Sequence, residues 1–271
     1  MIATSYRKKA RLLRTLAILT LCLAIRIPVD AHAAEITVAA AADLTFAFKD
    51  VAARFEKQTG NKVKLSYGSS GNFFSQIQNG APYDLFFSAD IDYPKKLETA
   101  GLIEAGSTYE YAAGKIVIWV PTASKLDLGH GLSVLLDSSI RKIAIANPEH
   151  APYGRAAKAA MQHDGIYDKV KDKLVLGENI SQTAQFVESG NADAGILALS
   201  LAVAPAMKDK GRYAEIPAGD YPAIEQAAVI LKSSHQKEIA AQFMKFLKEP
   251  ETVALMQQYG FAIPGDVAAT K

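Results

Sequence analysis

The chain has 271 residues, of which 49% are hydrophobic and 21% are charged, and its formal net charge is +2. A chain of this length can bury one large core or two medium ones. The near balance of charge argues against a nucleic-acid-binding protein, because such proteins are generally basic.

The first 33 residues have the pattern of a secretory signal peptide. Basic residues lie within 7–14, an apolar run covers 16–25, and Ala31-His32-Ala33 places small residues around a cleavage point. The apolar run is too short to cross a membrane, so we expect residues 1–33 to be removed and the product to be exported to the periplasm. The single cysteine, Cys22, would leave with the signal peptide, which excludes disulfides, thiolate catalysis and cysteine metal sites in the mature chain.

Removal of this segment also changes the charge. It holds six of the 30 lysines and arginines and one of the 28 acidic residues, so 24 basic and 27 acidic residues remain. The mature net charge is therefore near −3, which strengthens the argument against a nucleic-acid partner.

Apolar strand patterns alternate with helical patterns along the rest of the chain. The run 36–40 predicts a strand, and apolar residues at helical spacing from Leu44 to Phe55 predict a helix that ends near Gly60. Alternation of this kind predicts an α/β fold with largely parallel sheets. Further strands are predicted at 63–67, 84–88, 115–120, 143–146, 175–176, 195–197 and 227–231, and further helices at 73–77, 94–101, 154–164, 181–189, 236–247 and 250–259.

Four turns from a strand into a helix stand out, two in each half of the chain. They cover residues 39–45, 67–72, 147–155 and 177–183. Ligands of open α/β sheets bind at the carboxyl ends of strands, and the N-termini of helices there attract anions. Four such turns would suit a small anion held between two lobes.

Several motifs in a fixed order resemble the periplasmic molybdate-binding proteins, the substrate-binding subunits of molybdate ABC importers. The motifs are ITVAAAADLTFAF (36–48), GSSG (68–71), QIQNGAPYDLFFSAD (76–90), ANPEHAPYG (146–154) and YGF (259–261). The resemblance covers nearly the whole mature chain. It implies a two-lobed type II periplasmic binding fold, in which each lobe is a mostly parallel sheet flanked by helices and the ligand cleft lies between the lobes. The domain bounds expected from it are 1–33 for the signal peptide, 34–117 and 228–271 for lobe 1, and 118–227 for lobe 2.

The resemblance also implies the residues of the site. In that family, hydroxyl and backbone N–H groups hold the oxyanion without a cationic side chain, and fixed dipoles of this kind select by size and geometry. The motifs put Ser70, with Ser69 beside it, in the place of a binding serine, and Tyr153 and Ile180 in the places of backbone N–H donors. Asp43 stands where a first-turn serine is often found.

A second departure from the family pattern is Ala198, which stands where some members supply a tyrosine hydroxyl. The function implied is capture of a tetrahedral oxyanion, molybdate and also tungstate, by a monomer without a cofactor that delivers it to an ABC permease. Alternatives are a receptor or sensor of the same fold for sulfate or a small organic anion.

Structural roles compete with these assignments. Asp43 has the residue type of an N-cap, so we expect its side chain to cap its own helix, the alternative being a protonated carboxyl that donates to the anion. Ser69 and Ser70 would also suit a turn and a cap. For Asp84, Asp90 and Asp92, structural roles are favoured over a cation site.

An enzyme is the more distant alternative. A secreted hydrolase would need a G-x-S-x-G elbow with a histidine and an acid to follow, and GSSG is one residue short of that motif. The histidines of the mature chain show no metal-binding spacing. We therefore expect a binding protein without catalytic residues and without a site for a bare cation.

Overall fold

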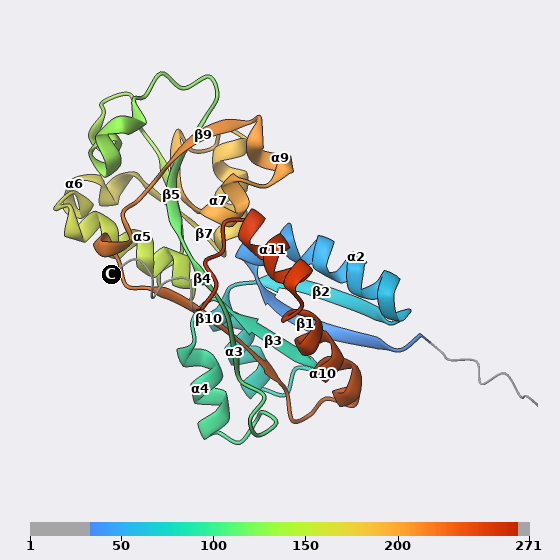
Figure 1. The fold of residues 1–271 in the computed structure, drawn as a ribbon. Helices are drawn as coiled ribbons and strands as arrows, with labels where there is room; N and C mark the ends of the chain where they lie inside the picture. Colours follow the sequence, from blue (N-terminus) through green and yellow to red (C-terminus); the bar gives the residue numbers. More distant parts are fainter. Residues whose placement is uncertain (1–32, 265–271) are drawn as a thin grey trace, which may run out of the picture. The chain divides into compact units, whose positions relative to one another are not determined.

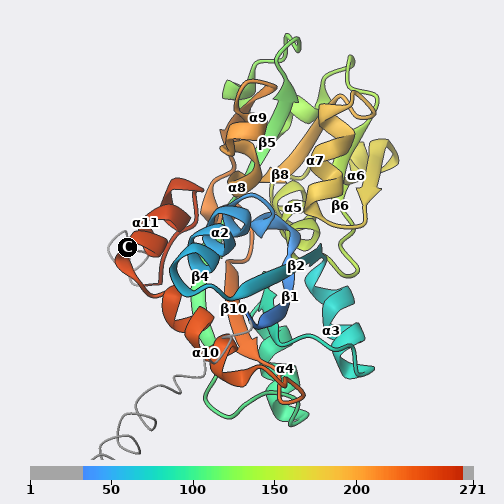
Figure 2. The same ribbon diagram turned by 90° about the vertical axis from the view of Figure 1, so that its right-hand side faces the viewer.

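The computed structural model describes residues 33–264. The predicted signal peptide, apart from Ala33, lies outside the described residues. Residues 34–264 belong to one compact unit, and it contains two five-stranded sheets flanked by helices (Figures 1 and 2). This arrangement confirms the predicted α/β fold with two lobes. Among the described residues, no helix combines the length and apolar character that crossing a membrane requires.

The sheet of lobe 1 has the strand order β2-β1-β3-β10-β4. Strand β1 is parallel to β2 and β3, whereas β10 runs antiparallel to β3 and β4. On one face of the sheet, the rings of Phe48, Phe87 and Phe243 pack edge to face with centroids 4.8–6.1 Å apart. The elements are β1 (Glu35–Ala41), η1 (Ala42–Leu44), α2 (Ala47–Thr59), β2 (Lys62–Gly68), α3 (Ser70–Gln78), β3 (Leu85–Ser88), α4 (Asp92–Thr99), β4 (Tyr109–Gly114), β10 (Ile224–Ile230), α10 (Lys237–Phe246) and α11 (Pro250–Gln258).

The sheet of lobe 2 has the strand order β7-β6-β8-β5-β9. Strand β6 is parallel to β7 and β8, and β5 is antiparallel to its two neighbours. The apolar run IVIWV of β5 is fully buried, as expected for a strand inside a sheet covered on both faces. The elements are β5 (Ile116–Pro121), η2 (Leu128–Leu136), β6 (Ile143–Ala146), α5 (Pro152–His163), α6 (Tyr167–Val170), η3 (Lys171–Lys173), β7 (Leu174–Gly177), α7 (Ile180–Glu188), β8 (Ala194–Ala198), α8 (Leu199–Ala202), α9 (Pro205–Lys208), β9 (Gly211–Glu215) and η4 (Ala218–Asp220).

The chain passes between the sheets twice. It leaves lobe 1 after β4 and enters lobe 2 with β5, and it returns between β9 and β10, so that β4 and β10 lie side by side where the lobes join (Figure 1). These strands differ from the predicted bounds, which ended the first part of lobe 1 at residue 117 and lobe 2 at residue 227. At the first crossing only Lys115 separates β4 from β5, and at the second the polar pair Glu225 and Gln226 interrupts the apolar pattern at the start of β10.

The parallel strands of both sheets end where the lobes meet. Turn η1 follows β1, α3 follows β2, α5 follows β6 after a short loop, and α7 follows β7. The four strand-to-helix turns singled out in the sequence therefore lie at one place in the fold.

Candidate functional site

A small cavity lies where the four turns meet. Its free volume for a water-sized sphere is about 10 Å³, which is close to the least that holds one water molecule. Pockets for organic ligands are far larger, so this conformation suits a small, compact guest. The lining residues are Ala41, Ala42, Asp43, Gly68, Ser69, Ser70 and Ala89 from lobe 1, and Ala151, Pro152, Tyr153, Asn179 and Ile180 from lobe 2.

All five site residues predicted from the sequence line this cavity. Asp43, Ser69 and Ser70 come from lobe 1, whereas Tyr153 and Ile180 come from lobe 2. Ala198, the other departure from the family pattern, ends β8 and does not line the cavity.

Two buried serine hydroxyls face the cavity from the start of α3. Ser69 is the N-cap residue of this helix, yet its side chain makes no capping bond and its Oγ has no partner within the described residues. Ser70 is fully buried, and its Oγ accepts a hydrogen bond from the N–H of Ala89 at 2.9 Å. The hydroxyl proton of Ser70 is therefore free to bind another acceptor.

Lobe 2 contributes the starts of two helices. Tyr153 is the second residue of α5, and Ile180 is the first residue of α7. The first N–H groups of a helix have no acceptor within the helix, and they carry its partial positive charge. Gly154 lets α5 begin close against β6, since a Cβ at this position would lie 2.0 Å from the carbonyl oxygen of Ala146.

Asp43 is the charged residue of the cavity, and it is 1% exposed. Its Oδ2 accepts hydrogen bonds from the Tyr153 hydroxyl at 3.0 Å and from Gln226 Nε2 at 2.8 Å. Gln226 in turn accepts a bond from the Tyr111 hydroxyl at 2.6 Å. Asp43 Oδ1 is buried and has no partner within the described residues. Burial raises the pKa of Asp43 to about 6, although the bonds from Gln226 and Tyr153 act to lower it.

The prediction that Asp43 caps its own helix is wrong. Neither η1 nor α2 has a side-chain capping bond, and their N-cap positions belong to Ala41 and Phe46. The carboxylate instead accepts from donors on β10 and α5, which lie far from it in the sequence and could not be seen in the local pattern.

Sequence reasoning missed Gln226 and Tyr111, and it gave the Tyr153 side chain no role. One signal was available for Gln226. It is a polar residue inside the apolar strand Ile224–Ile230, and it is fully buried. Buried amides need hydrogen-bond partners, so its position indicated a polar network without indicating its members.

Contacts between the lobes surround the cavity and hold this conformation closed. They include polar bonds, a backbone bond and an ion pair of Arg155, whose guanidinium also lies 5.8 Å from the centre of the Tyr93 ring. The contacts are Gly71 N–H to His150 O (3.0 Å), Thr45 Oγ1 with Ser181 Oγ (2.9 Å), Ser181 Oγ to Ala42 O (2.8 Å), Ser200 Oγ to Asp43 O (2.8 Å), Asn72 with Glu178, and Arg155 with Asp90.

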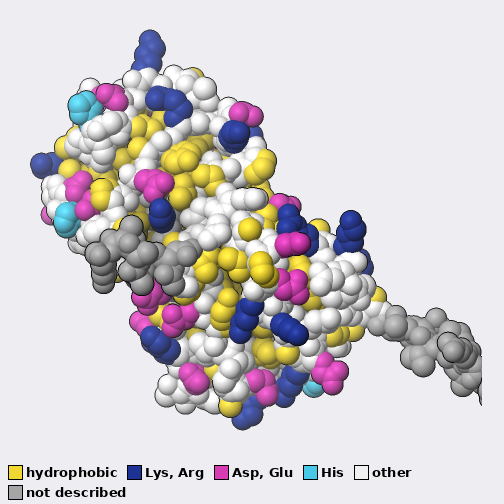
Figure 3. Space-filling model, in the orientation of Figure 1, with side chains coloured by type: hydrophobic (Ala, Val, Ile, Leu, Met, Phe, Trp, Pro, Cys, Tyr) yellow, Lys and Arg dark blue, Asp and Glu magenta, His cyan; other side chains and the backbone are white. Residues whose placement is uncertain are grey.

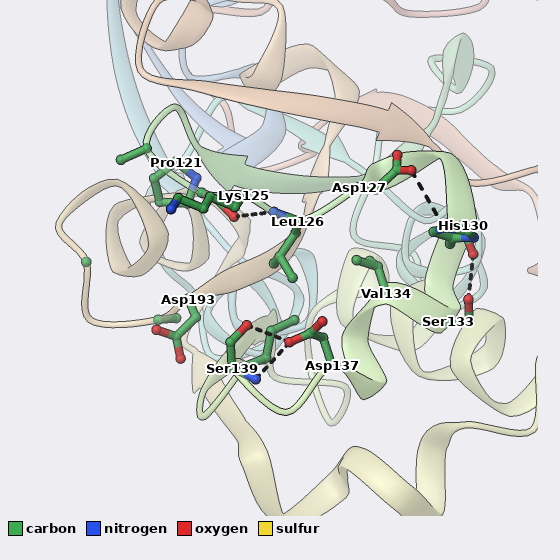
Figure 4. Close-up of a pocket in the computed structure, with 15 residues that line it drawn as sticks. Pro121, Lys125, Leu126, Asp127, His130, Ser133, Val134, Asp137, Ser139 and Asp193 are labelled. Atoms are coloured by element: carbon green, nitrogen blue, oxygen red, sulfur yellow. Dashed lines mark hydrogen bonds and ion pairs between the residues drawn. The ribbon is translucent and has the colours of Figure 1, made fainter.

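Lobe 2 has a larger hollow of about 900 Å³, lined by residues from 121–140 and 190–193 (Figure 4). The carboxylates that line this hollow already accept hydrogen bonds from nearby residues of the protein. Asp127 accepts from the N–H of Gly129, Asp137 accepts from Ser139, and Asp193 accepts from the N–H groups of residues 141 and 142. These bonds shape loops, so the smaller cavity between the lobes is the better candidate site.

Two of the three aspartates considered for a cation site, Asp84 and Asp90, have partners within the protein, whereas Asp92 is the first residue of α4 and does not cap it. Asp84 accepts from Thr37 and Ser234, and Asp90 pairs with Arg155. Within residues 33–264, the side chains near enough to share a cation are His163, Asp164 and Asp220, of which the first two are exposed.

Comparison with known proteins agrees with this fold. The family described as bacterial extracellular solute-binding protein matches residues 36–262. The chain belongs to this family. Among its relatives, the molybdate-binding protein ModA of Azotobacter vinelandii is 41% identical over 86% of this chain and 92% of the relative. The ModA of Rhodobacter capsulatus is 36% identical over 89% and 93%.

A solved structure extends the comparison to three dimensions. The periplasmic molybdate-binding protein of Azotobacter vinelandii matches with a TM-score of 0.80 and 38% identity, and the match covers 84% of this chain and 99% of that one. The chain shares the fold of that protein, and the cavity described above lies between its two lobes.

Proposed function

We propose that this chain captures molybdate in the periplasm and delivers it to the permease of an ABC importer. The observation that carries the proposal is the set of donors around a cavity of ionic size. An unpaired, buried serine hydroxyl, a second serine with a free proton and two helix starts meet there. The identities with two proteins named for molybdate binding support the choice of ligand.

This donor set suits a desolvated oxyanion. None of the lining residues is lysine, arginine or histidine, so a bound anion would be held by neutral dipoles. Such groups cost less to desolvate than a cation, and bonds from them to an anion are charge-assisted. Because the donors come from both lobes, a bound anion would link the two lobes. Release of the anion would then require the lobes to separate.

The same donors serve binding without catalysis. The cavity lining contains no histidine or cysteine, and its carboxylate, Asp43, is bonded to Tyr153 and Gln226. We propose no enzymatic activity and no resident cofactor. The protein would act as a monomer after export, and charges of both signs are interspersed on the face shown in Figure 3, as is usual for a protein without a nucleic-acid partner.

Titration calorimetry of oxyanions into the protein tests the function. We expect molybdate and tungstate to bind alike and sulfate to bind at least tenfold more weakly. Sulfate is smaller, so it would leave some donors in the closed cavity unpaired, at about 1–3 kcal/mol each, and about 1.4 kcal/mol is a factor of ten. Equal affinity for sulfate and molybdate would contradict selection by size. Tight binding of sulfate, or of a small organic anion alone, would favour the alternative receptors.

Ser69→Ala should weaken molybdate binding roughly ten- to hundredfold without changing the melting temperature of the free protein. The change removes a bond to the anion worth about 1.5–3 kcal/mol, but no bond to the protein, because Ser69 Oγ has no partner within the described residues. Ser75→Ala, on an exposed position of the same helix, is the matched control. Lowered stability with unchanged affinity would show that Ser69 only caps α3.

A further inference from the structure

Asp43 presents a carboxylate to a cavity that we assign to an anion. One of its oxygens, Oδ2, accepts from Tyr153 and Gln226. The other, Oδ1, is buried and has no partner in the part of the chain that the structure describes. Since Asp43 also lines the cavity, Oδ1 is the oxygen left to interact with a guest. An ionised Oδ1 would repel a dianion, and the low dielectric of a closed site strengthens the repulsion.

The neighbours of Asp43 cannot relieve this repulsion with a positive charge. Tyr111 on β4, Gln226 on β10 and Tyr153 on α5 face its side chain, and Ser200 on α8 bonds to its backbone oxygen. The two tyrosines have pKa values raised well above 10, through burial and then through the charge of Asp43, so they remain neutral.

The nearest cation among the interlobe contacts does not reach the cavity. Arg155 is paired with Asp90 and is not a lining residue. Asp43 is therefore the titratable group of the cavity that can change its charge when a dianion enters.

We propose that capture is coupled to a proton: when the anion binds, Asp43 takes up one proton from solution on Oδ1 and donates it in a hydrogen bond to the anion. Oδ2 continues to accept from Tyr153 and Gln226, so the network that joins the lobes is unchanged. The inference rests on the proposed function and specifies how the same site tolerates an acid. The pKa of about 6 agrees with it, because little further stabilisation is needed to protonate the group near neutral pH.

The coupling has a defined sign. The protonated form is the one that binds, so affinity is highest below pH 6, where the free protein already carries the proton. Above pH 6 binding must take up the proton, and affinity falls toward tenfold per pH unit. The fall continues until the pH exceeds the pKa of Asp43 in the complex.

Calorimetry at pH 7.5, in several buffers with different enthalpies of ionisation, measures the protons taken up per molybdate bound. We expect nearly one for the natural protein and none for Asp43→Asn, whose affinity should be flat between pH 6.5 and 8.5. Tyr153→Phe removes a donor that favours the ionised carboxylate, so uptake should begin at a higher pH in this variant.

The outcomes separate the two proposals. Tight binding of molybdate by the natural protein without proton uptake would overturn the coupling and leave the proposed function intact. Absence of molybdate binding would overturn both. Because the natural protein alone gives the proton count, the test does not depend on the folding of either variant.

Discussion

Replacement of Gly71 by alanine is expected to weaken molybdate binding ten- to hundredfold and to leave the unliganded protein as stable as before. A Cβ at this position would lie 2.7 Å from the carbonyl oxygen of His150 and 3.0 Å from its Cα, both backbone atoms of the opposite lobe, and 2.8 Å from the Tyr93 hydroxyl of its own lobe. The Tyr93 hydroxyl is the end of a side chain that can turn away, whereas the backbone of His150 can move only if the lobes separate. Forced overpacking of this kind costs about 1–3 kcal/mol, and here the cost falls on the closed state. The open state is expected to become slightly more stable, because alanine favours a helix more than glycine does.

Calorimetry and thermal unfolding with and without molybdate measure the two effects separately. The melting temperature without ligand should stay the same or rise, while the increase caused by ligand should shrink. Gly219→Ala is the matched control, since no atom lies within 4 Å of its added Cβ. Full affinity in Gly71→Ala would show that the lobes bind the anion without the approach of α3 to His150.

Ser70→Ala should damage both affinity and stability. The hydroxyl is expected to donate to the anion, so its loss should weaken binding roughly ten- to hundredfold. It also accepts from the buried N–H of Ala89, and an unpaired buried N–H costs about 1–3 kcal/mol. The melting temperature of the free protein should therefore fall, by roughly 2–4 °C for each kcal/mol in a chain of this size.

The pair of serine variants gives a contrast that neither gives alone. Both should lose affinity, but Ser70→Ala should also lose stability, whereas Ser69→Ala should not. Unfolding curves of the two free proteins, recorded under the same conditions, check this difference. If the two variants unfold at the same temperature, the bond from Ala89 to Ser70 does not contribute to stability.

The predicted strands correspond to the inner strands of both sheets and to the edge strands β2 and β7, and the two strands missed, β4 and β9, are the other edges. β4 contains alanine and glycine with two tyrosines, and β9 contains exposed Arg212 and Tyr213. Edge strands are covered on fewer sides, so they need no continuous apolar run, and the hydrophobic pattern marks β2 and β7 but not β4 and β9.

The candidate site was predictable where it depends on local sequence. A serine turn before a helix, or a helix start after a strand, is encoded by a few adjacent residues, and this local pattern gave the four turns. The resemblance to the molybdate-binding proteins then singled out Ser69, Ser70, Tyr153 and Ile180 within them. The environment of Asp43 depends on Tyr153 and Gln226, which are 110 and 183 positions away in the sequence. A single sequence contains no signal for such pairs, so the local N-cap preference led to the wrong role.

The position of β10 in its sheet has a consequence for how the chain is made. β10 lies between β3 and β4, although it follows them by more than 100 residues. Lobe 1 therefore lacks an inner strand until residues 224–230 have been synthesised, whereas all five strands of lobe 2 are complete by Glu215. A nascent chain cannot finish the sheet of lobe 1 early, and long-range pairing of this kind folds slowly. In the export that we propose, slow completion of lobe 1 would help to keep the chain unfolded until it has crossed the membrane.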